Sequence, residues 1–226
     1  MPFDTLPGGA SLKPTPFTAK VSDDDLSSFK QLLKLSRIGP KTYENLQEDR
    51  HFGVTHKWLS DTKQHWEASY DWRKTEARIN SHPNFKVKIE DIDVHFIGLF
   101  SKKSDAVPIA LLHGWPGSFL EFLGVLDVLK GKYSEDDLPM HVIVPSLPGY
   151  GYSSGPPLDR DYKTEDIARI IDQLMKGLGF ENGYVSQGGD IGSFVTRVLG
   201  AKYDSCKAVH CESRSPLSAE AAFVLT

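Results

Sequence analysis

The chain has 226 residues, of which 39% are hydrophobic and 11% aromatic, so it carries enough apolar side chains for one substantial core. Its formal net charge is −4 and both signs are dispersed, which argues against a nucleic-acid groove or an anionic-membrane surface. No run of about 18 apolar residues predicts a membrane span, and residues 1–16 lack a signal-peptide pattern. We therefore expect a cytoplasmic protein with a small-molecule partner.

The two cysteines, Cys206 and Cys211, lie close together near the C-terminus. They have no partner cysteines, and no suitably spaced histidine pair accompanies them as zinc ligands require. The sequence therefore predicts two free thiols and no metal site.

The first part of the chain predicts helices followed by β structure. Ser22 precedes three aspartates and apolar residues at helical spacing, which predicts a capped amphipathic surface helix. A second helix is predicted over about residues 61–79, before the breaker at residues 80–83. Residues 85–100 then form a β-like stretch, in which residues 92–97 show the alternation of a half-buried strand. Within this strand we interpret His95 as a residue with satisfied hydrogen bonds rather than as a ligand.

From residue 107 onward, apolar strands alternate with helices, a pattern typical of a parallel sheet. The predicted strands cover residues 107–112, 141–145, 184–186 and 206–209. The predicted helices cover residues 119–130, 164–178 and 193–199. The fold class predicted from this order is α/β.

The turn Gly188-Gly189-Asp190-Ile191-Gly192 lies between a predicted strand and a predicted helix, where an α/β-hydrolase carries its nucleophile. Small residues are expected at 188 and 192 because this sharp turn brings its neighbours close together. Ser186 is disfavoured as a nucleophile, since Tyr184 occupies the position that would then have to be small. A carboxylate attacks saturated carbon and leaves an alkyl ester, so Asp190 predicts an epoxide or alkyl halide substrate.

A second motif, His113-Gly114-Trp115-Pro116-Gly117-Ser118, follows the first parallel strand at the end where open α/β sheets bind ligands. Such a loop contributes one backbone N–H to an oxyanion hole, and the residue after the nucleophile contributes another. The predicted donors are therefore Trp115 and Ile191. The residues predicted to support the two loops are His113, Gly114, Pro116, Gly188, Gly189 and Gly192. We interpret His113 as a brace for its loop rather than as the catalytic base.

Three motifs in order, HGWPGSFLEF at 113–122, PSLPGYGYS at 145–153 and GGDIGS at 188–193, resemble the microsomal-type epoxide hydrolases, particularly soluble fungal members. The N-terminal part is similar to that family's extension, through Trp72-Arg73 with Glu76, His82-Pro83-Asn84-Phe85 and residues 92–96. The resemblance implies a partial α/β-hydrolase fold, in which helices flank a mostly parallel sheet. Residues 1–100 would be the helical and β extension, and residues 101–226 the first half of the catalytic domain.

The resemblance also implies a mechanism without a cofactor. Asp190 would attack an epoxide carbon while two lid tyrosines donate to the ring oxygen. A histidine paired with a carboxylate would then activate water and release a vicinal diol. The implied partners are a small apolar epoxide and water. The assembly state is open, and a homodimer is one possibility.

In the family the lid, its tyrosines, the acid and the histidine follow the nucleophile, and too few residues follow Asp190 here to encode them. His210 is the one histidine beyond Asp190, with Asp204, Glu212 and Glu220 nearby. It is predicted to end a strand, whereas the base of this fold belongs on a loop after the last strand. From residue 211 the tail departs from the family. We therefore expect that the chain is C-terminally truncated and does not turn over substrate. The truncation is either biological or an artefact of the gene model.

Two other functions stay open. One is a non-catalytic remnant that binds an apolar ligand or a partner, which epoxide-to-diol conversion abolished by Asp190→Ala would reject. The other is a haloalkane dehalogenase, which also uses an aspartate nucleophile and would release halide. The N-terminal extension and the His-Gly-Trp-Pro loop argue against the dehalogenase.

Overall fold

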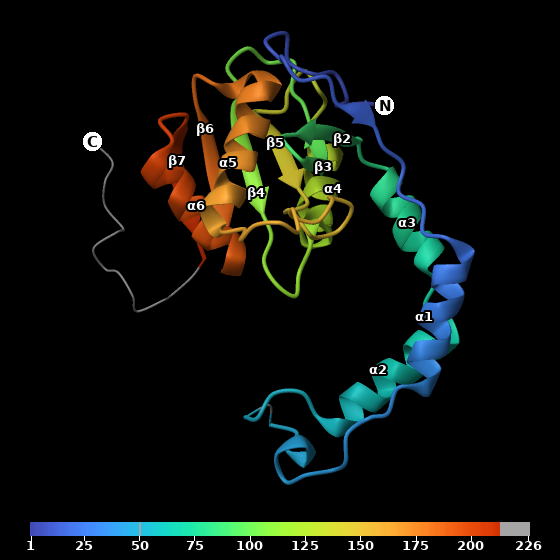
Figure 1. Ribbon diagram of the computed structural model, residues 1–226. Coiled ribbons are helices and arrows are strands. Elements are labelled where there is room, and N and C mark those ends of the chain that lie inside the picture. Colours follow the sequence, from blue (N-terminus) through green and yellow to red (C-terminus); the bar gives the residue numbers. More distant parts are fainter. Residues whose placement is uncertain (50, 213–226) are drawn as a thin grey trace. The chain divides into compact units, whose positions relative to one another are not determined.

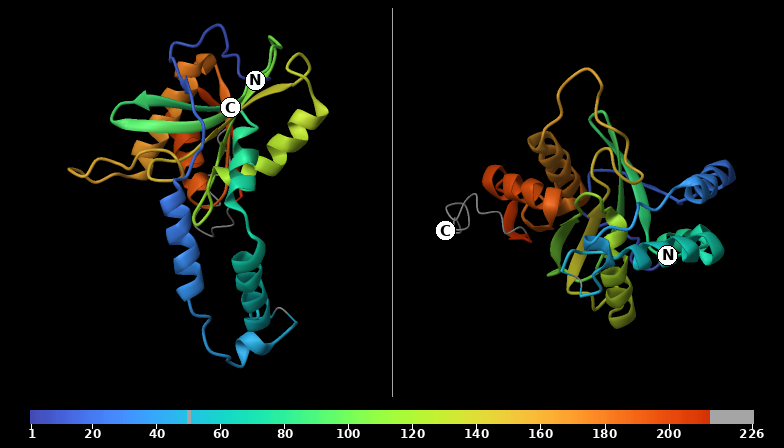
Figure 2. Two further views of the ribbon diagram at one scale, coloured as in Figure 1. Left: turned by 90° about the vertical axis from the view of Figure 1, so that its right-hand side faces the viewer. Right: turned by 90° about the horizontal axis from the view of Figure 1, so that it is seen from below.

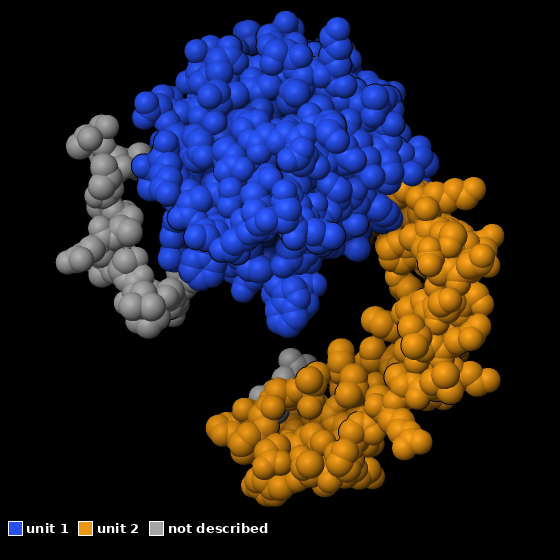
Figure 3. All heavy atoms as spheres, viewed as in Figure 1, with its two compact units in different colours: residues 1–18, 79–226 blue, residues 19–78 orange. Residues whose placement is uncertain are grey.

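The computed structural model describes residues 1–49 and 51–212, which form two compact units (Figures 1 and 3). The helical unit comprises residues 19–78, and the sheet unit comprises residues 1–18 and the described residues from 79 onward. The elements in chain order are β1 (Thr15–Pro16), α1 (Asp23–Leu35), η1 (Glu44–Leu46), α2 (His56–Ser69), α3 (Trp72–Asn80), β2 (Asn84–Ile89), β3 (Ile92–Leu99), β4 (Val107–Leu112), η2 (Phe119–Phe122), α4 (Leu123–Lys132), β5 (Met140–Pro145), α5 (Thr164–Met175), η3 (Lys176–Phe180), β6 (Tyr184–Gly188), α6 (Asp190–Lys202) and β7 (Cys206–Cys211).

The first helix of the helical unit, α1, begins where the sequence predicts. The Ser22 hydroxyl accepts a hydrogen bond from the Asp25 N–H at 3.0 Å, which satisfies one of the unpaired donors of the first turn. The three aspartates of that turn lie at the positive end of the helix dipole. The predicted cap is therefore confirmed.

The single helix predicted over residues 61–79 is wrong, because two helices occupy this region. The first, α2, begins earlier, where the Thr55 hydroxyl accepts the Trp58 N–H at 3.1 Å. It ends at Ser69, and Tyr70 is extended. The Asp71 carboxylate then accepts the Arg73 N–H at 3.0 Å and starts α3. An aspartate cap inside a helical pattern thus divides the segment.

A seven-stranded mixed sheet forms the sheet unit, in the order β1-β2-β3-β5-β4-β6-β7 (Figure 1). The neighbours β5, β4, β6 and β7 run parallel, as the alternation from residue 107 predicts. The strands β1, β2 and β3 pair antiparallel, and β3 joins β5 antiparallel. All seven strands therefore belong to one sheet, and the carboxyl ends of its parallel strands lie at one edge.

The β stretch predicted over residues 85–100 is a hairpin rather than one strand. Glu90 has a φ of 52°, and this left-handed residue turns the chain so that Ile89 faces Ile92 in the ladder. The Glu90 carboxylate is held by the Arg169 guanidinium, with a 2.9 Å contact to Nε. The predicted half-burial is also wrong from Val94 onward, where every residue through Leu99 is buried. Over these residues, other parts of the sheet unit cover both faces of β3.

Helices lie on both faces of the sheet (Figure 2). The helices α5 and α6 pack against each other on one face, and α4 lies on the other. The predicted apolar stripe of α5 is confirmed as core, since Ile170, Ile171 and Leu174 are all fully buried. They pack in one cluster with strand residues such as Leu112 and Ile143. This packing fixes the strand ends that carry the candidate site.

Candidate active site

Asp190 lies on a sharp turn at the junction of β6 and α6. The strand ends at Gly188, Gly189 is extended with a φ of −108°, and the helix begins at Asp190 itself. Asp190 has a φ of 48°, a left-handed conformation that costs a residue with a side chain on the order of 1–3 kcal/mol. The surrounding packing holds this strain, and the carboxylate is exposed. The turn therefore presents Asp190 as a nucleophile elbow presents its nucleophile.

Two glycines of this turn are required by close contacts. A Cβ at Gly188 would lie 2.2 Å from the carbonyl oxygen of Gly192, and one at Gly192 would lie 2.2 Å from the carbonyl oxygen of Leu112. Both obstacles are backbone atoms that no side-chain rotation removes. Gly189 differs, because a Cβ there would meet nothing nearer than a Glu212 carboxylate oxygen at 3.6 Å. The structure thus separates two obligatory glycines from one with room for a side chain.

The loop between β4 and η2 reaches the same point. The Trp115 N–H donates to Asp190 Oδ1 at 2.8 Å. The Trp115 N–H lowers the pKa of Asp190 most, the Ile191 N–H lowers it further, and desolvation opposes both. The two predicted backbone donors are therefore brought together on the predicted carboxylate, which is ionised at neutral pH.

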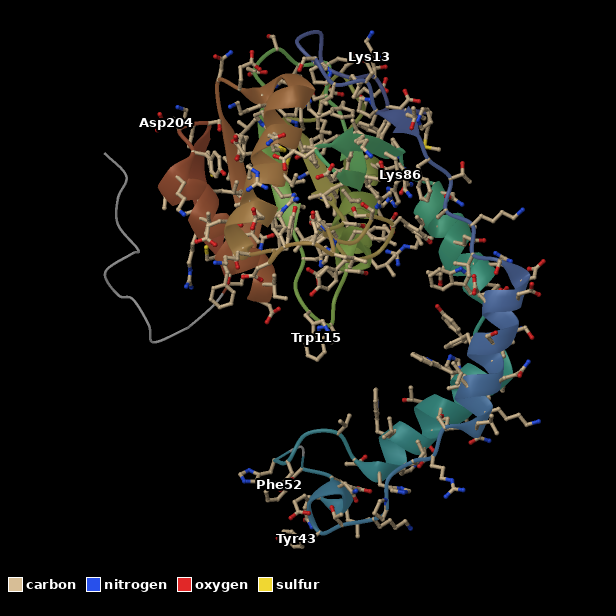
Figure 4. All side chains as sticks on the ribbon, viewed as in Figure 1. Lys13, Tyr43, Phe52, Lys86, Trp115 and Asp204 are labelled. Atoms are coloured by element: carbon tan, nitrogen blue, oxygen red, sulfur yellow. The ribbon has the colours of Figure 1, made fainter. Side chains whose placement is uncertain are left out.

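Gly114 lets this loop approach Asp190. A Cβ at Gly114 would lie 2.5 Å from the Cβ of Asp190 and 2.7 Å from Oδ1. The next peptide, between Trp115 and Pro116, is cis. The Trp115 side chain is 67% exposed and points away from the sheet unit at the tip of its loop (Figure 4). Only the backbone of Trp115 is thus used at Asp190, while its indole is available for other contacts.

His113 is buried and holds the Gly114–Trp115 peptide. Its Nε2 accepts the Leu147 N–H at 3.1 Å, so the proton of the neutral ring resides on Nδ1. Nδ1–H then donates to the Gly114 carbonyl at 3.2 Å. Burial lowers the pKa of His113, which the hydrogen bond to Gly114 only partly offsets. The ring is therefore a neutral brace, and its partner carbonyl shares one peptide unit with the Trp115 N–H.

A further carboxylate near this loop, Glu121, was not singled out from the sequence. Burial raises the pKa of Glu121, and the charges of Glu212 and Asp190 raise it further. Its Oε2 lies 2.5 Å from the position that a Cβ on Gly117 would take. The residues next to Glu121 in the sequence gave no sign of this role, because its carboxylate is brought close to Gly117 only in the folded chain.

His210 lies on β7, where it pairs with Gln187, and its side chain is exposed. Within residues 1–49 and 51–212, the structure shows no hydrogen bond or ion pair between His210 and Asp204 or Glu212. Glu220 lies outside the described residues. Cys206 and Cys211 are free thiols, as predicted. Over the same described residues, no group of three or more histidine, cysteine or acidic side chains is arranged to hold a metal ion.

No helix in the part of the chain that the structure describes is both long enough and apolar enough to cross a bilayer.

Comparisons with known proteins bear on both parts of the chain. A sequence profile described as "Epoxide hydrolase N terminus" matches residues 14–122, and one described as "alpha/beta hydrolase fold" matches residues 107–223. A putative epoxide hydrolase of Dothistroma septosporum is 42% identical over 215 residues, which are 92% of this chain and 51% of that protein. Epoxide hydrolase 1 of Sus scrofa is 35% identical over 80% of this chain and 40% of its own length.

Among solved structures, the epoxide hydrolase of Aspergillus niger is similar with a TM-score of 0.89 and 52% sequence identity, over 95% of this chain and 56% of that one. The chain thus spans about half the length of the relatives it matches. The chain belongs to the epoxide hydrolase family, with the α/β-hydrolase fold.

Proposed function

We propose that the enzyme to which this sequence belongs opens an apolar epoxide to a vicinal diol, with Asp190 as the nucleophile. The observation that carries this proposal is the exposed, ionised Asp190 carboxylate, held by the Trp115 N–H at 2.8 Å on a strained turn. A carboxylate at such a turn attacks saturated carbon. The relatives are named epoxide hydrolases, which favours an epoxide over a haloalkane.

The reaction then has two balanced steps. In the first, a carboxylate oxygen of Asp190 forms a bond to an epoxide carbon as the carbon–oxygen bond of the ring breaks, and the ring oxygen takes a proton from an acid, which the family resemblance implies is a lid tyrosine of the whole enzyme. In the second, water adds to the ester carbonyl and the bond between the acyl carbon and the alkoxy oxygen breaks, while the proton left over returns to the acid that protonated the ring oxygen. The diol leaves with one oxygen from Asp190, and the carboxylate is regenerated with an oxygen from water.

The Trp115 and Ile191 N–H groups serve both steps in this proposal. They orient the carboxylate before attack, and they stabilise the oxyanion that forms when water adds to the ester. His113, Gly114 and Pro116 support the first donor, and Gly188, Gly189 and Gly192 support the turn that carries the second. The donors thus belong to the part of the enzyme that this chain encodes.

We further propose that residues 1–100 act as the family's N-terminal extension and residues 101–226 as the first half of the catalytic domain. In this proposal the nucleophile and its donors are among the described residues, and we expect alkylation of Asp190 without efficient ester hydrolysis in the 226-residue chain. General acid–base catalysis contributes typically about 10²–10⁴-fold, which is the loss expected where the water-activating histidine is lacking.

The proposal is tested by incubating the purified 226-residue chain with styrene oxide as an apolar probe and measuring its intact mass. We expect a gain of one epoxide mass, and peptide mapping should place the adduct on Asp190. Asp190→Asn should abolish it. The matched control is Asp159→Asn, which changes another exposed carboxylate, 81% exposed, outside the site. An adduct that survives Asp190→Asn, or no adduct on a folded chain, would refute the proposal.

Two finer statements stay predictions of the sequence, a homodimeric assembly and a cytoplasmic location. Light scattering of the purified chain at several concentrations measures the first, and a monomer mass throughout would contradict it. Fractionation of the source cells measures the second, and recovery of the enzyme with membranes would contradict it.

A further inference from the structure

A buried histidine on β3, His95, lies between two polar side chains from distant parts of the chain. Its ring is fully buried. Its Nε2 lies 3.0 Å from Asn84 Oδ1, and its Nδ1 lies 2.9 Å from Ser146 Oγ. Asn84 is on β2, and Ser146 directly follows β5. The ring therefore links the antiparallel hairpin to the loop at the carboxyl end of a parallel strand.

The hydrogen bonds of this group have one consistent direction. The Asn84 amide nitrogen donates to the carbonyls of Ile79 and His82, each at 2.8 Å, so its oxygen is the acceptor toward the ring. His95 Nε2–H then donates to Asn84 Oδ1, and the bare Nδ1 accepts the Ser146 hydroxyl proton. Burial lowers the pKa of His95 to about 3, so the ring is neutral and keeps this tautomer at neutral pH. Every polar atom of the imidazole is thus used.

The backbone around Ser146 is held as firmly as its side chain. The Ser146 N–H donates to the His95 carbonyl at 2.8 Å, and the Ser146 carbonyl accepts the Ser153 hydroxyl at 2.7 Å. The backbone at Gly151 lies so close to Ser146 that a Cβ at position 151 would be 2.6 Å from Ser146 Oγ. The loop from Ser146 to Ser153 is therefore fixed to β3 at both of its ends.

The residue after Ser146 connects this arrangement to the candidate active site. The Leu147 N–H donates to His113 Nε2, and His113 donates to the Gly114 carbonyl. The same peptide unit carries the Trp115 N–H that holds Asp190. Peptide units are planar, so whatever orients the Gly114 carbonyl also orients the Trp115 N–H. The path from His95 to Asp190 is continuous, through Ser146, Leu147, His113 and one peptide.

We propose that His95 is a positioning residue for the Trp115 N–H donor, acting through the Ser146–Leu147 backbone and the His113 ring. Aromatic neighbours keep the His95 ring in place, since the rings of Phe119 and Phe17 lie with centroids 4.9 and 5.2 Å away. The hairpin that carries His95 belongs to the segment matched by the N-terminal profile. The hairpin thereby contributes to the site without contacting Asp190. Only the catalytic consequence of this role rests on the proposed function.

The test compares two buried serines at opposite ends of the sheet. Ser146→Ala removes the hydroxyl donated to His95. Ser101→Ala is the matched control, because the Ser101 hydroxyl donates to the Leu138 carbonyl at 2.6 Å, after the far end of β3. Both changes remove one buried hydroxyl, so both lower global stability by a similar mechanism. Only Ser146→Ala should disturb the Trp115 donor.

The readout is hydrogen exchange of the Trp115 backbone amide, followed by NMR in the substrate-free 226-residue chain. Urea concentrations are chosen so that both variants have the same global unfolding free energy. We expect Trp115 exchange to be about tenfold faster in Ser146→Ala and unchanged in Ser101→Ala. Equal rates in the two variants would overturn the proposal. Should Ser146→Ala not fold, Ser146→Cys replaces it, because a thiol of similar shape is a weaker donor.

Because no epoxide is used, this result is separable from the proposed function. If the mass adduct fails to form while Trp115 exchange responds to Ser146→Ala, the positioning role stands and the nucleophile assignment falls. The reverse result refutes the positioning role alone.

Discussion

Mild acid is expected to destabilise the fold through His95. The folded-state pKa of His95 is about 3, set mainly by desolvation and to a lesser degree by the Lys86 charge, whereas the unfolded chain has the ordinary value of about 6.5. Between these values the unfolded state binds the proton and the folded state does not. The His95 contribution is therefore fully present above about pH 6.5 and is lost as the pH falls toward 3.

The size of the effect follows from the two pKa values. One group that differs in this way changes the free energy of unfolding by about 1.4 kcal/mol per pH unit within the window. From pH 7.5 to pH 5, the His95 share amounts to about 2 kcal/mol. His113 and His141 add to the same trend, because burial lowers the pKa of each. The acid loss of the wild-type chain should thus exceed the His95 share.

Urea unfolding at pH 7.5 and pH 5 measures this difference in the wild-type chain and in His95→Gln. The variant should be less stable at pH 7.5, yet it should lose about 2 kcal/mol less than wild type on acidification. Val94→Ala is the matched control, since it truncates a fully buried neighbour on β3 that does not titrate. It should lower stability and keep the wild-type pH dependence. Parallel losses in wild type and His95→Gln would refute the reasoning.

Other predictions concern the turn and the loop at Asp190. Gly192→Ala should lower the melting temperature sharply, because its Cβ would lie 2.2 Å from the Leu112 carbonyl oxygen, and overpacking of this kind costs about 1–3 kcal/mol or more. Gly189→Ala should melt close to wild type, and equal damage from both changes would contradict the contact argument. Asp190→Gly should be about 1 kcal/mol more stable than Asp190→Ala in urea, since glycine accepts a φ of 48° without strain; equal stability would show that the turn is unstrained. Trp115→Ala should change the free energy of unfolding by no more than about 0.5 kcal/mol, because the side chain is 67% exposed. A larger change in thermal melting would show that the indole packs against the fold.

Local signals in the sequence predicted the central parallel strands well. The strand at residues 107–112 has the predicted bounds, and the strand predicted at 184–186 extends to Gly188. Short apolar runs bounded by turn residues and alternating with helical segments favour buried parallel strands, so the uncertainty lay mainly in the strand ends. The helical unit was predicted less well, because the Asp71 cap resembles an ordinary polar position within a helical repeat.

The sequence alone sufficed to propose the kind of chemistry at the site. Asp190 between small residues after a predicted strand indicates a carboxylate nucleophile, because this turn pattern occupies adjacent positions in the chain. The same locality let the loop at 113–118 be recognised as a source of a backbone donor. Motif spacing therefore sufficed to predict a candidate nucleophile and its two candidate backbone donors.

Only the tertiary structure decided how the donor is held. The contacts from Asn84 to His95, from His95 to Ser146, and from Leu147 to His113 join residues far apart in the chain. Such contacts leave no periodic signal, because each depends on the register of neighbouring strands and on burial that excludes water. The sequence of this protein indicates the proposed nucleophile, whereas the packing of its sheet directs the Trp115 N–H toward the Asp190 carboxylate.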